Sequence, residues 1–233
     1  GQFAVLLTSQ DPSTHLGGEV RIFDVNGNEI HRVYSSSDIF GPALAISDDG
    51  QYVAFGNTQI NDWDIENETQ LPLITGQYSN SNWVSEMVFA KDGKSILAGE
   101  SSGTINVWDI QTGNLIRVLS GHTGSVFDLD ISPNGNYLVS VGSHYNHETG
   151  AGDKTVRVWQ ISESRQICIF DAYNYGFEDV SFSPDGSLFF TLDHEYQGYG
   201  SIKVFSSANC QMIRNINDLD YPIHYLRLSP DGL

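Results

Sequence analysis

Two short features recur along this chain at nearly the same interval, and they recur in phase. Tight turns of the Asp-Gly or Asn-Gly type end at glycines that lie 43, 42, 51 and 46 residues apart, namely Gly50, Gly93, Gly135, Gly186 and Gly232. An aromatic residue inside an apolar stretch recurs at intervals of 40, 45, 51 and 46 residues, at Phe23, Trp63, Trp108, Trp159 and Phe205. Two independent markers that advance together indicate a structural repeat of about 45 residues.

The repeat that spans residues 126–170 shows what one unit contains. An apolar strand at 126–131 leads into a Ser-Pro-Asn-Gly turn, and further strands are expected at 137–141, 155–159 and 166–170. Short apolar alternations without helical spacing are typical of β-structure. Four antiparallel strands form a small sheet that cannot bury both of its faces alone, so neighbouring sheets must stack around an axis. We therefore predict an all-β fold.

The sequence resembles the WD-repeat (tryptophan–aspartate repeat) β-propeller family. The resemblance rests on Gly121-His122, on Trp63-Asp64 and Trp108-Asp109, and on the Ser-Pro-Asp-Gly turns at 183–186 and 229–232. It implies a β-propeller of four-stranded antiparallel blades, with about five repeat units in this chain. The expected blades are 1–38, 39–78, 79–122, 123–172 and 173–218, and residues 219–233 would be the start of the next blade or a closing strand.

The number of blades in the complete ring stays open at this point. The chain begins inside a second strand and stops just after a first strand, so residues 219–233 would complete unit 1 in a closed five-bladed ring. The alternative is that the chain is part of a longer propeller, most often seven-bladed in this family. The absence of an initiator Met favours the second arrangement.

The resemblance also implies a buried polar network in each blade, built from Trp, Ser or Thr, His and Asp. The fourth unit matches it fully, with His122, Ser140, Asp153 and Trp159, and these residues are therefore interpreted as structural rather than catalytic. The third unit keeps only Trp108, the second keeps Trp63, and the fifth has Thr191 and Phe205. We expect those blades to depend mainly on apolar packing.

Composition restricts the kind of partner. The chain has 11 basic and 29 acidic residues, a net charge of −18, and such a surface repels phosphate. We expect no nucleic acid partner, no membrane contact and no cofactor, but a protein or peptide partner with basic character. The two cysteines, Cys168 and Cys210, are too few for a disulfide framework, which suits a reducing compartment and predicts a cytoplasmic location.

A binding surface is expected at the entrance to the ring. Glu86, Asp128 and Asp179 occupy the same position in three consecutive innermost strands, so their carboxylates would attract a cationic ligand. The alternative is that these acids are simply hydrated. Aromatic side chains near the same entrance would supply anchor contacts or pack between blades; they are Trp83, Phe127, Tyr175 and Tyr221.

A second possible class of function is catalysis. The long loops of units 4 and 5 contain His144, His147 and His194, residue types that suit zinc in a propeller enzyme or metal-dependent site. The spacing matches no established zinc signature, so a solvated polar loop is the simpler interpretation. Residues 99–103 match Gly-x-Ser-x-Gly, but a strand follows where a nucleophile elbow needs a helix. We therefore expect a non-catalytic interaction scaffold or sensing module within a larger protein.

Overall fold

The fold is all-β, as the repeat predicts. The computed structural model describes residues 3–9, 18–24, 26–35, 43–56, 59–74, 82–142, 152–171, 177–194 and 200–217, with Ile223, Leu226, Leu228 and Ser229. The one helical element in these ranges is a short 3-10 helix, Ile161–Glu163. Within them, no helix has the length and apolar character needed to cross a membrane.

The strands follow one another as antiparallel meanders, and each meander is one sheet, here called a blade. Blade 1 has β1 (Phe3–Ser9), β2 (Gly18–Asp24) and β3 (Glu29–Ser35). Blade 2 has β4 (Ala43–Ile46), β5 (Tyr52–Gly56), β6 (Ile60–Asp64) and β7 (Thr69–Gln70). Blade 3 has β8 (Val84–Phe89), β9 (Ser95–Glu100), β10 (Thr104–Asp109) and β11 (Leu115–Ser120).

Blades 4 and 5 repeat the same order. Blade 4 has β12 (Val126–Ile131), β13 (Tyr137–Gly142), β14 (Thr155–Gln160) and β15 (Arg165–Asp171). Blade 5 has β16 (Phe177–Phe182), β17 (Leu188–His194), β18 (Gly200–Ser206) and β19 (Met212–Ile216). Four blades are thus four-stranded, and the first contains three strands in the described part of the chain.

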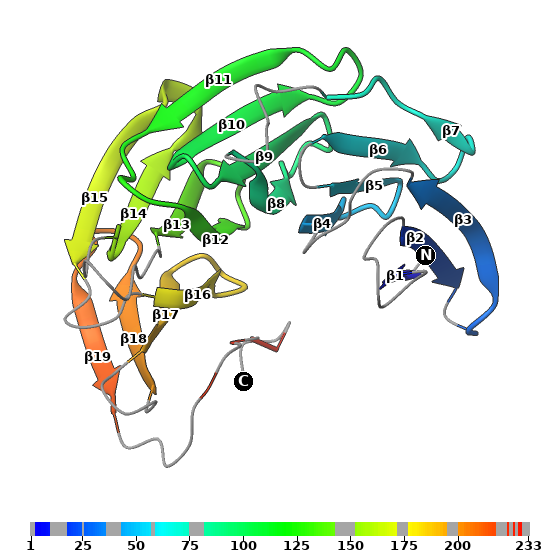
Figure 1. Cartoon of the computed structure of the whole chain (residues 1–233). Coiled ribbons are helices and arrows are strands. Elements are labelled where there is room, and N and C mark those ends of the chain that lie inside the picture. The colour runs from blue at the N-terminus through cyan, green and yellow to red at the C-terminus, as the bar shows by residue number, and fades with distance from the viewer. Residues whose placement is uncertain are drawn as a thin grey trace.

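The blades are arranged side by side around a centre (Figure 1). The first strands of blades 2 to 5, which are β4, β8, β12 and β16, contact one another in sequence and form the inner wall. The fourth strands lie on the outside of the arc, which remains open between blade 1 and blade 5 in Figure 1. Most of residues 219–233 lies outside the described residues, so the closed five-bladed ring and the longer propeller both stay predictions.

The hydrophobic core consists of separate apolar clusters between neighbouring blades. Trp108 packs in the cluster between blades 2 and 3, and Trp159 packs in the cluster between blades 3 and 4. A third cluster joins blades 4 and 5 through Val139, Val158 and Phe189. Blades 3 and 4 therefore each bury both faces against the blades before and after them. This dependence on neighbours is the reason a single repeat cannot fold alone.

The turns that mark the repeat are stabilised in the same way in blades 2, 4 and 5. In blade 5, the Ser183 hydroxyl donates a hydrogen bond to Asp185 over 2.6 Å and accepts one from the Leu188 N–H over 3.0 Å. Ser47 and Ser132 make the equivalent pairs of contacts in the other two blades. The turn glycines have φ near +70°, a conformation that side chains disfavour, which explains why glycine recurs there.

A disulfide joins two blades. Cys168, on β15, is bonded to Cys210, in the turn that follows β18, with their Cα atoms 6.5 Å apart. The two residues are separated by 42 positions in the sequence. The sequence does not predict this pairing, because the two cysteines belong to different repeats and meet only when blades 4 and 5 stack.

Candidate functional site: the entrance face of the propeller

The polar network of blade 4 lies at one end of the sheet, and its four residues contact one another as the resemblance implies. The Trp159 indole N–H donates to the Ser140 hydroxyl over 2.8 Å, and that hydroxyl lies 2.7 Å from His122 Nε2. His122 Nδ1 lies 3.1 Å from an Asp153 carboxylate oxygen. Gly142 is required beside this network, since a Cβ there would lie 2.6 Å from the Asp153 carboxylate.

Asp153 is the charged member of this group of four, and the guanidinium of Arg157 lies 3.7 Å from its carboxylate. Burial lowers the pKa of His122 and outweighs the opposing effect of Asp153, so the imidazole is neutral. Burial opposes ionisation of Asp153, but hydrogen bonds from His122 and Thr155 hold the pKa of this carboxyl well below its usual range. A neutral imidazole donates to Asp153 and accepts from Ser140, so each of the four side chains in the network has a hydrogen-bond partner. Because all of its groups are internally paired, the network orients strands rather than substrates.

Blades 3 and 5 contain polar networks of other kinds in addition to their apolar packing, and the family pattern does not predict these networks. In blade 3, the buried carboxylate of Glu100 accepts hydrogen bonds from neutral donors alone, namely Asn82, Ser102, Thr104 and Asn106. In blade 5, Lys203 forms a buried ion pair with Asp193 and lies 5.5 Å from the centre of the Phe177 ring.

The carboxylates predicted at the ring entrance connect neighbouring blades. Asp128 on β12 accepts a hydrogen bond from the Val180 N–H of β16 over 2.8 Å. Asp179, on β16, accepts one from the Leu226 N–H over 2.8 Å, which places Leu226 beside β16. Asp130 extends the same pattern, since it accepts from the Phe182 N–H over 2.7 Å. These three acids therefore help to stabilise the inner wall, and the attraction of a cationic ligand to the entrance stays a prediction.

Asp128 and Asp179 also interact with each other. Burial, the hydrogen bond with Asp179 and the negative charges of Asp179 and Glu86 together raise the pKa of Asp128 to about 9. Asp179, the partner of Asp128 in this pair, is only 2% exposed. The third predicted entrance acid, Glu86, lies on β8 and is half-buried.

Two of the predicted aromatic anchors are exposed at the same end of the inner wall. Trp83, just before β8, is 40% exposed, and Phe127, near the start of β12, is 48% exposed. β8 and β12 are adjacent inner strands, so the two rings belong to neighbouring blades. The other two predicted anchors, Tyr175 and Tyr221, lie outside the described residues.

The backbone around Trp83 is held by hydrogen bonds from several loops. The Trp83 N–H donates to the Ser101 hydroxyl over 3.0 Å, and the Ser101 N–H donates to the Trp83 carbonyl over 2.9 Å. The Ser101 hydroxyl donates in turn to Asn82, and Ser125 of the next blade donates to the Ser101 carbonyl. Ser101 is the serine of the Gly-x-Ser-x-Gly match, and it lies in the hairpin between β9 and β10, as predicted.

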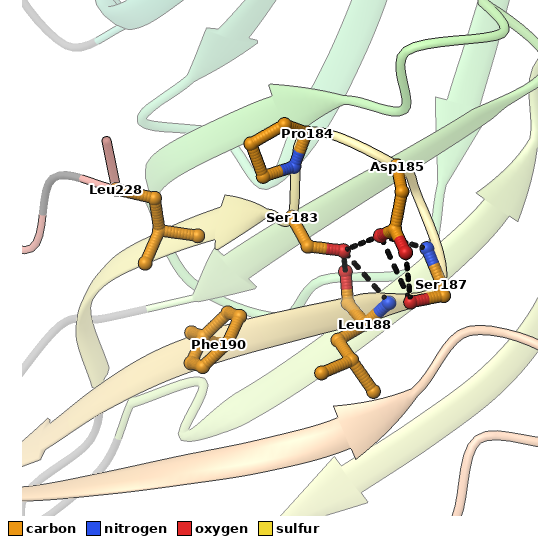
Figure 2. Close-up of a pocket in the computed structure, with 7 residues that line it drawn as sticks. All are labelled: Ser183, Pro184, Asp185, Ser187, Leu188, Phe190 and Leu228. Atoms are coloured by element: carbon orange, nitrogen blue, oxygen red, sulfur yellow. Dashed lines mark hydrogen bonds between the residues drawn. The ribbon is translucent and has the colours of Figure 1, made fainter. Parts of the chain in front are cut away.

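A hollow of about 270 Å³ lies at the opposite end of blade 5, beside the Ser183-Pro184-Asp185 turn (Figure 2). Leu188, Phe190 and Leu228 form its apolar side. The polar atoms that face the hollow already form hydrogen bonds within the turn. Those from Ser183 and Ser187 to the Asp185 carboxylate lower the pKa of Asp185 to about 2. The hollow therefore contributes apolar surface and no reactive group.

The predicted metal ligands are not tested by the structure. His144 and His147 lie outside the described residues, and His194 ends β17 without a described side chain. Among the side chains that the structure does describe, no three His, Cys, Asp or Glu residues are grouped as a metal site would require.

Comparison with known proteins supports the WD-repeat resemblance. A family model described as "WD domain, G-beta repeat" matches residues 70–109 and 113–160, which fall in blades 2 to 4. A chain in the crystal structure of the mitotic checkpoint complex superposes over all of this chain and 69% of its own length, with a TM-score of 0.78 and 19% sequence identity. The repeats, the sheet order and these matches agree: the chain has the fold of a WD-repeat β-propeller, and its central repeats match the family model.

Curated relatives resemble parts of the chain. An uncharacterized WD repeat-containing protein of Synechocystis is 32% identical over 152 residues, 64% of this chain and 40% of that protein. Guanine nucleotide-binding protein subunit beta-5b of Danio rerio is 27% identical over 190 residues, covering 66% and 47% of the two chains. Subunit I of eukaryotic translation initiation factor 3 from Aspergillus fumigatus is 25% identical over 134 residues, covering 57% and 36%. The chain thus spans less than half of the length of these relatives.

Proposed function

We propose that the chain is a non-catalytic interaction module, part of a larger protein, that binds a protein or peptide at the entrance face of the propeller. The observation that supports this most directly is the pair of exposed rings, Trp83 and Phe127, on adjacent inner strands. Large aromatic side chains on a rigid support are typical energetic anchors of protein interfaces. The names of two relatives, a G-protein beta subunit and an initiation factor subunit, describe members of protein assemblies.

The charge of the chain supports a basic partner. A net charge of −18 raises the rate of encounter with a cationic segment and disfavours an acidic one. Glu86 lies on β8, the strand that Trp83 precedes, so its carboxylate would meet a Lys or Arg side chain of a segment held by the two rings. Asp128 is less suited to this role, because burial and the neighbouring Asp179 raise its pKa.

The test is a selection from a peptide library displayed on phage, with the wild-type chain as bait. We expect the selected peptides to be enriched in Lys and Arg, and to bind the Trp83→Ala/Phe127→Ala variant at least about tenfold more weakly, since truncation of an aromatic anchor costs about 2 kcal/mol. Tyr137→Ala is the matched control, because Tyr137 is also an exposed aromatic (37%) but lies at the opposite end of blade 4. Equal binding by the double variant would contradict the proposal.

The alternative function is that of a metal-dependent enzyme that uses the loops of units 4 and 5. A metal analysis distinguishes this alternative from the interaction module. Stoichiometric zinc in the purified chain, lost in a His144→Ala/His147→Ala variant, would favour it over the interaction module.

A further inference from the structure

The outer rim of the propeller has a surface character unlike the rest of the chain. Thirteen large apolar side chains are exposed among the described residues, and eight of them lie on the outermost strands of blades 3, 4 and 5. They are Leu115, Ile116 and Val118 on β11, Ile167 and Ile169 on β15, and Met212, Ile213 and Ile216 on β19. An outermost strand also leaves one row of backbone N–H and C=O groups without a strand beyond it.

This exposure does not come from the open side of the arc, at least for β11. Blade 3 is covered on one face by blade 2 and on the other by blade 4, through the apolar clusters described above. Even so, five of the six residues of β11 are exposed, and only Leu119 is buried. Protein edge strands are normally protected by shortness, charge or proline, and β11 has none of these except one arginine.

The charge of β11 is opposite to that of the chain. Its sequence, Leu-Ile-Arg-Val-Leu-Ser, contains no acidic residue. Arg117 is exposed and has no ion-pair partner in the part of the chain that the structure describes, although acidic residues outnumber basic ones 29 to 11. By comparison, Arg165 on β15 pairs with Glu163 over 2.9 Å. β11 therefore combines aliphatic surface, a free sheet edge and an unneutralised cation.

We propose that β11 is a docking edge for an extended, acidic segment of a partner protein, which adds to blade 3 as a fifth strand. Backbone hydrogen bonds to the free edge would supply affinity, and aliphatic side chains of the segment would cover Ile116 and Val118. A carboxylate of the segment would pair with Arg117, whose planar guanidinium suits bidentate contact with an acid. The docking edge lies on the rim, apart from the entrance face that holds Trp83 and Phe127. It would bind an acidic segment, whereas the entrance face would bind a basic one.

A second copy of this chain is a poorer occupant. Two antiparallel β11 strands would bring their Arg117 side chains close together, and like charges across a strand pair are destabilising. The rest of each copy carries a strong negative charge, which adds to the repulsion.

The experiment is a fluorescence anisotropy titration of the whole 233-residue chain with two labelled peptides. One peptide alternates Glu or Asp with Ile or Val, and the other has Lys in place of every acid. We expect the acidic peptide to bind and the lysine peptide to bind at least tenfold more weakly, although net charge alone favours the opposite order. Hydrogen exchange should show new protection at residues 115–120 when the acidic peptide is bound.

Matched variants locate the binding. Arg117→Glu and Val118→Lys should each weaken the acidic peptide about tenfold or more, which is the usual weight of a charge-assisted contact or of a charge placed on a pairing edge. Lys94→Glu makes the same change of charge at another exposed site of blade 3 and should leave binding unchanged. Arg117→Gln, a milder change, serves if Arg117→Glu does not fold. Trp83→Ala/Phe127→Ala should bind the acidic peptide like the wild type, so this result is independent of the entrance-face proposal.

Several results would overturn the inference. They are tighter binding of the lysine peptide, unchanged binding by both Arg117 variants, protection confined to residues outside 115–120, or a dimer in sedimentation that Val118→Lys converts to monomer. The last result would assign the edge to a second copy of the chain.

Discussion

Asp62 occupies a place in the repeat where blades 3, 4 and 5 have valine and blade 1 has Ile22. It directly precedes Trp63, as Val107 precedes Trp108 and Val158 precedes Trp159, and Val204 precedes Phe205. It lies opposite Ala54 on the face that packs against blade 3, is fully buried, and neither carboxyl oxygen has a hydrogen-bond partner. Burial raises the pKa of Asp62 to about 7. An unpaired acid in an apolar cluster opposes folding.

We expect Asp62→Val to stabilise the chain, and to do so more at high pH. The native state holds the Asp62 proton between pH 4 and pH 7, whereas the unfolded chain has lost it, so wild-type stability falls across that range and then levels off. A pKa difference of about three units corresponds to roughly 4 kcal/mol above pH 7. Urea titrations of both proteins at pH 4.5 and pH 8 measure the difference.

Asp62→Asn is the control for charge, because it keeps the shape of the side chain and cannot ionise. It should lose the fall in stability between pH 4 and pH 7 without the added apolar surface of valine. A wild-type minus variant difference that stays constant with pH would show that Asp62 is not the titrating group.

Residue-scale features divide clearly into those that the sequence predicts and those that it does not. The network of His122, Ser140, Asp153 and Trp159 is predicted, because all of its members follow the family pattern within one repeat. The Glu100 network and the Asp193–Lys203 pair are missed, since they replace that pattern with other residue types at other positions. Asp62 could have been found by aligning the repeats on their aromatic residues, which sets one acid against three valines.

At the scale of strands, the sequence predicts elements well because their signals are local. The expected strand at 126–131 and the turn that follows it are both observed. The contacts between inner strands are less accessible to sequence reasoning. Asp128 is a sequence-based candidate for attracting a ligand, but its carboxylate and that of Asp130 accept backbone hydrogen bonds from β16, 52 residues further along the chain. Only the stacking of the blades brings these groups together.

Asp130→Ala tests the contribution of these carboxylates to the inner wall. The substitution removes the acceptor for the Phe182 N–H and for the Ser181 hydroxyl. We expect a loss of about 1–3 kcal/mol in the free energy of unfolding, the usual cost of an unsatisfied buried donor, together with faster hydrogen exchange at Phe182. Asp92→Ala, at an exposed turn of blade 3 where the carboxylate accepts only from the Lys94 N–H, should change stability by less than about 0.5 kcal/mol. Equal effects of the two substitutions would argue against the bridging role.

At the scale of the whole molecule, each blade depends on its neighbours, and most of that dependence is apolar. Blades 4 and 5 have in addition one covalent link, between Cys168 and Cys210. The predicted cytoplasmic location is not tested by the structure, and it bears on this bond because cytosolic thiols are normally kept reduced. In a reducing compartment the two blades would be joined by packing alone, and in an oxidising one they would be cross-linked.

The disulfide should make a measurable contribution to stability when it is formed. A cross-link over 42 residues restricts the unfolded chain, and the chain-entropy relation gives about 4 kcal/mol for a loop of this length. We expect the oxidised wild type to lose about 2–4 kcal/mol in urea titrations after reduction, with the transition of blades 4 and 5 affected most. The Cys168→Ala/Cys210→Ala variant should match the reduced protein and should not respond to reductant. Alkylation followed by intact-mass measurement gives the thiol state directly, and two free thiols in the unreduced protein would contradict the link between the blades.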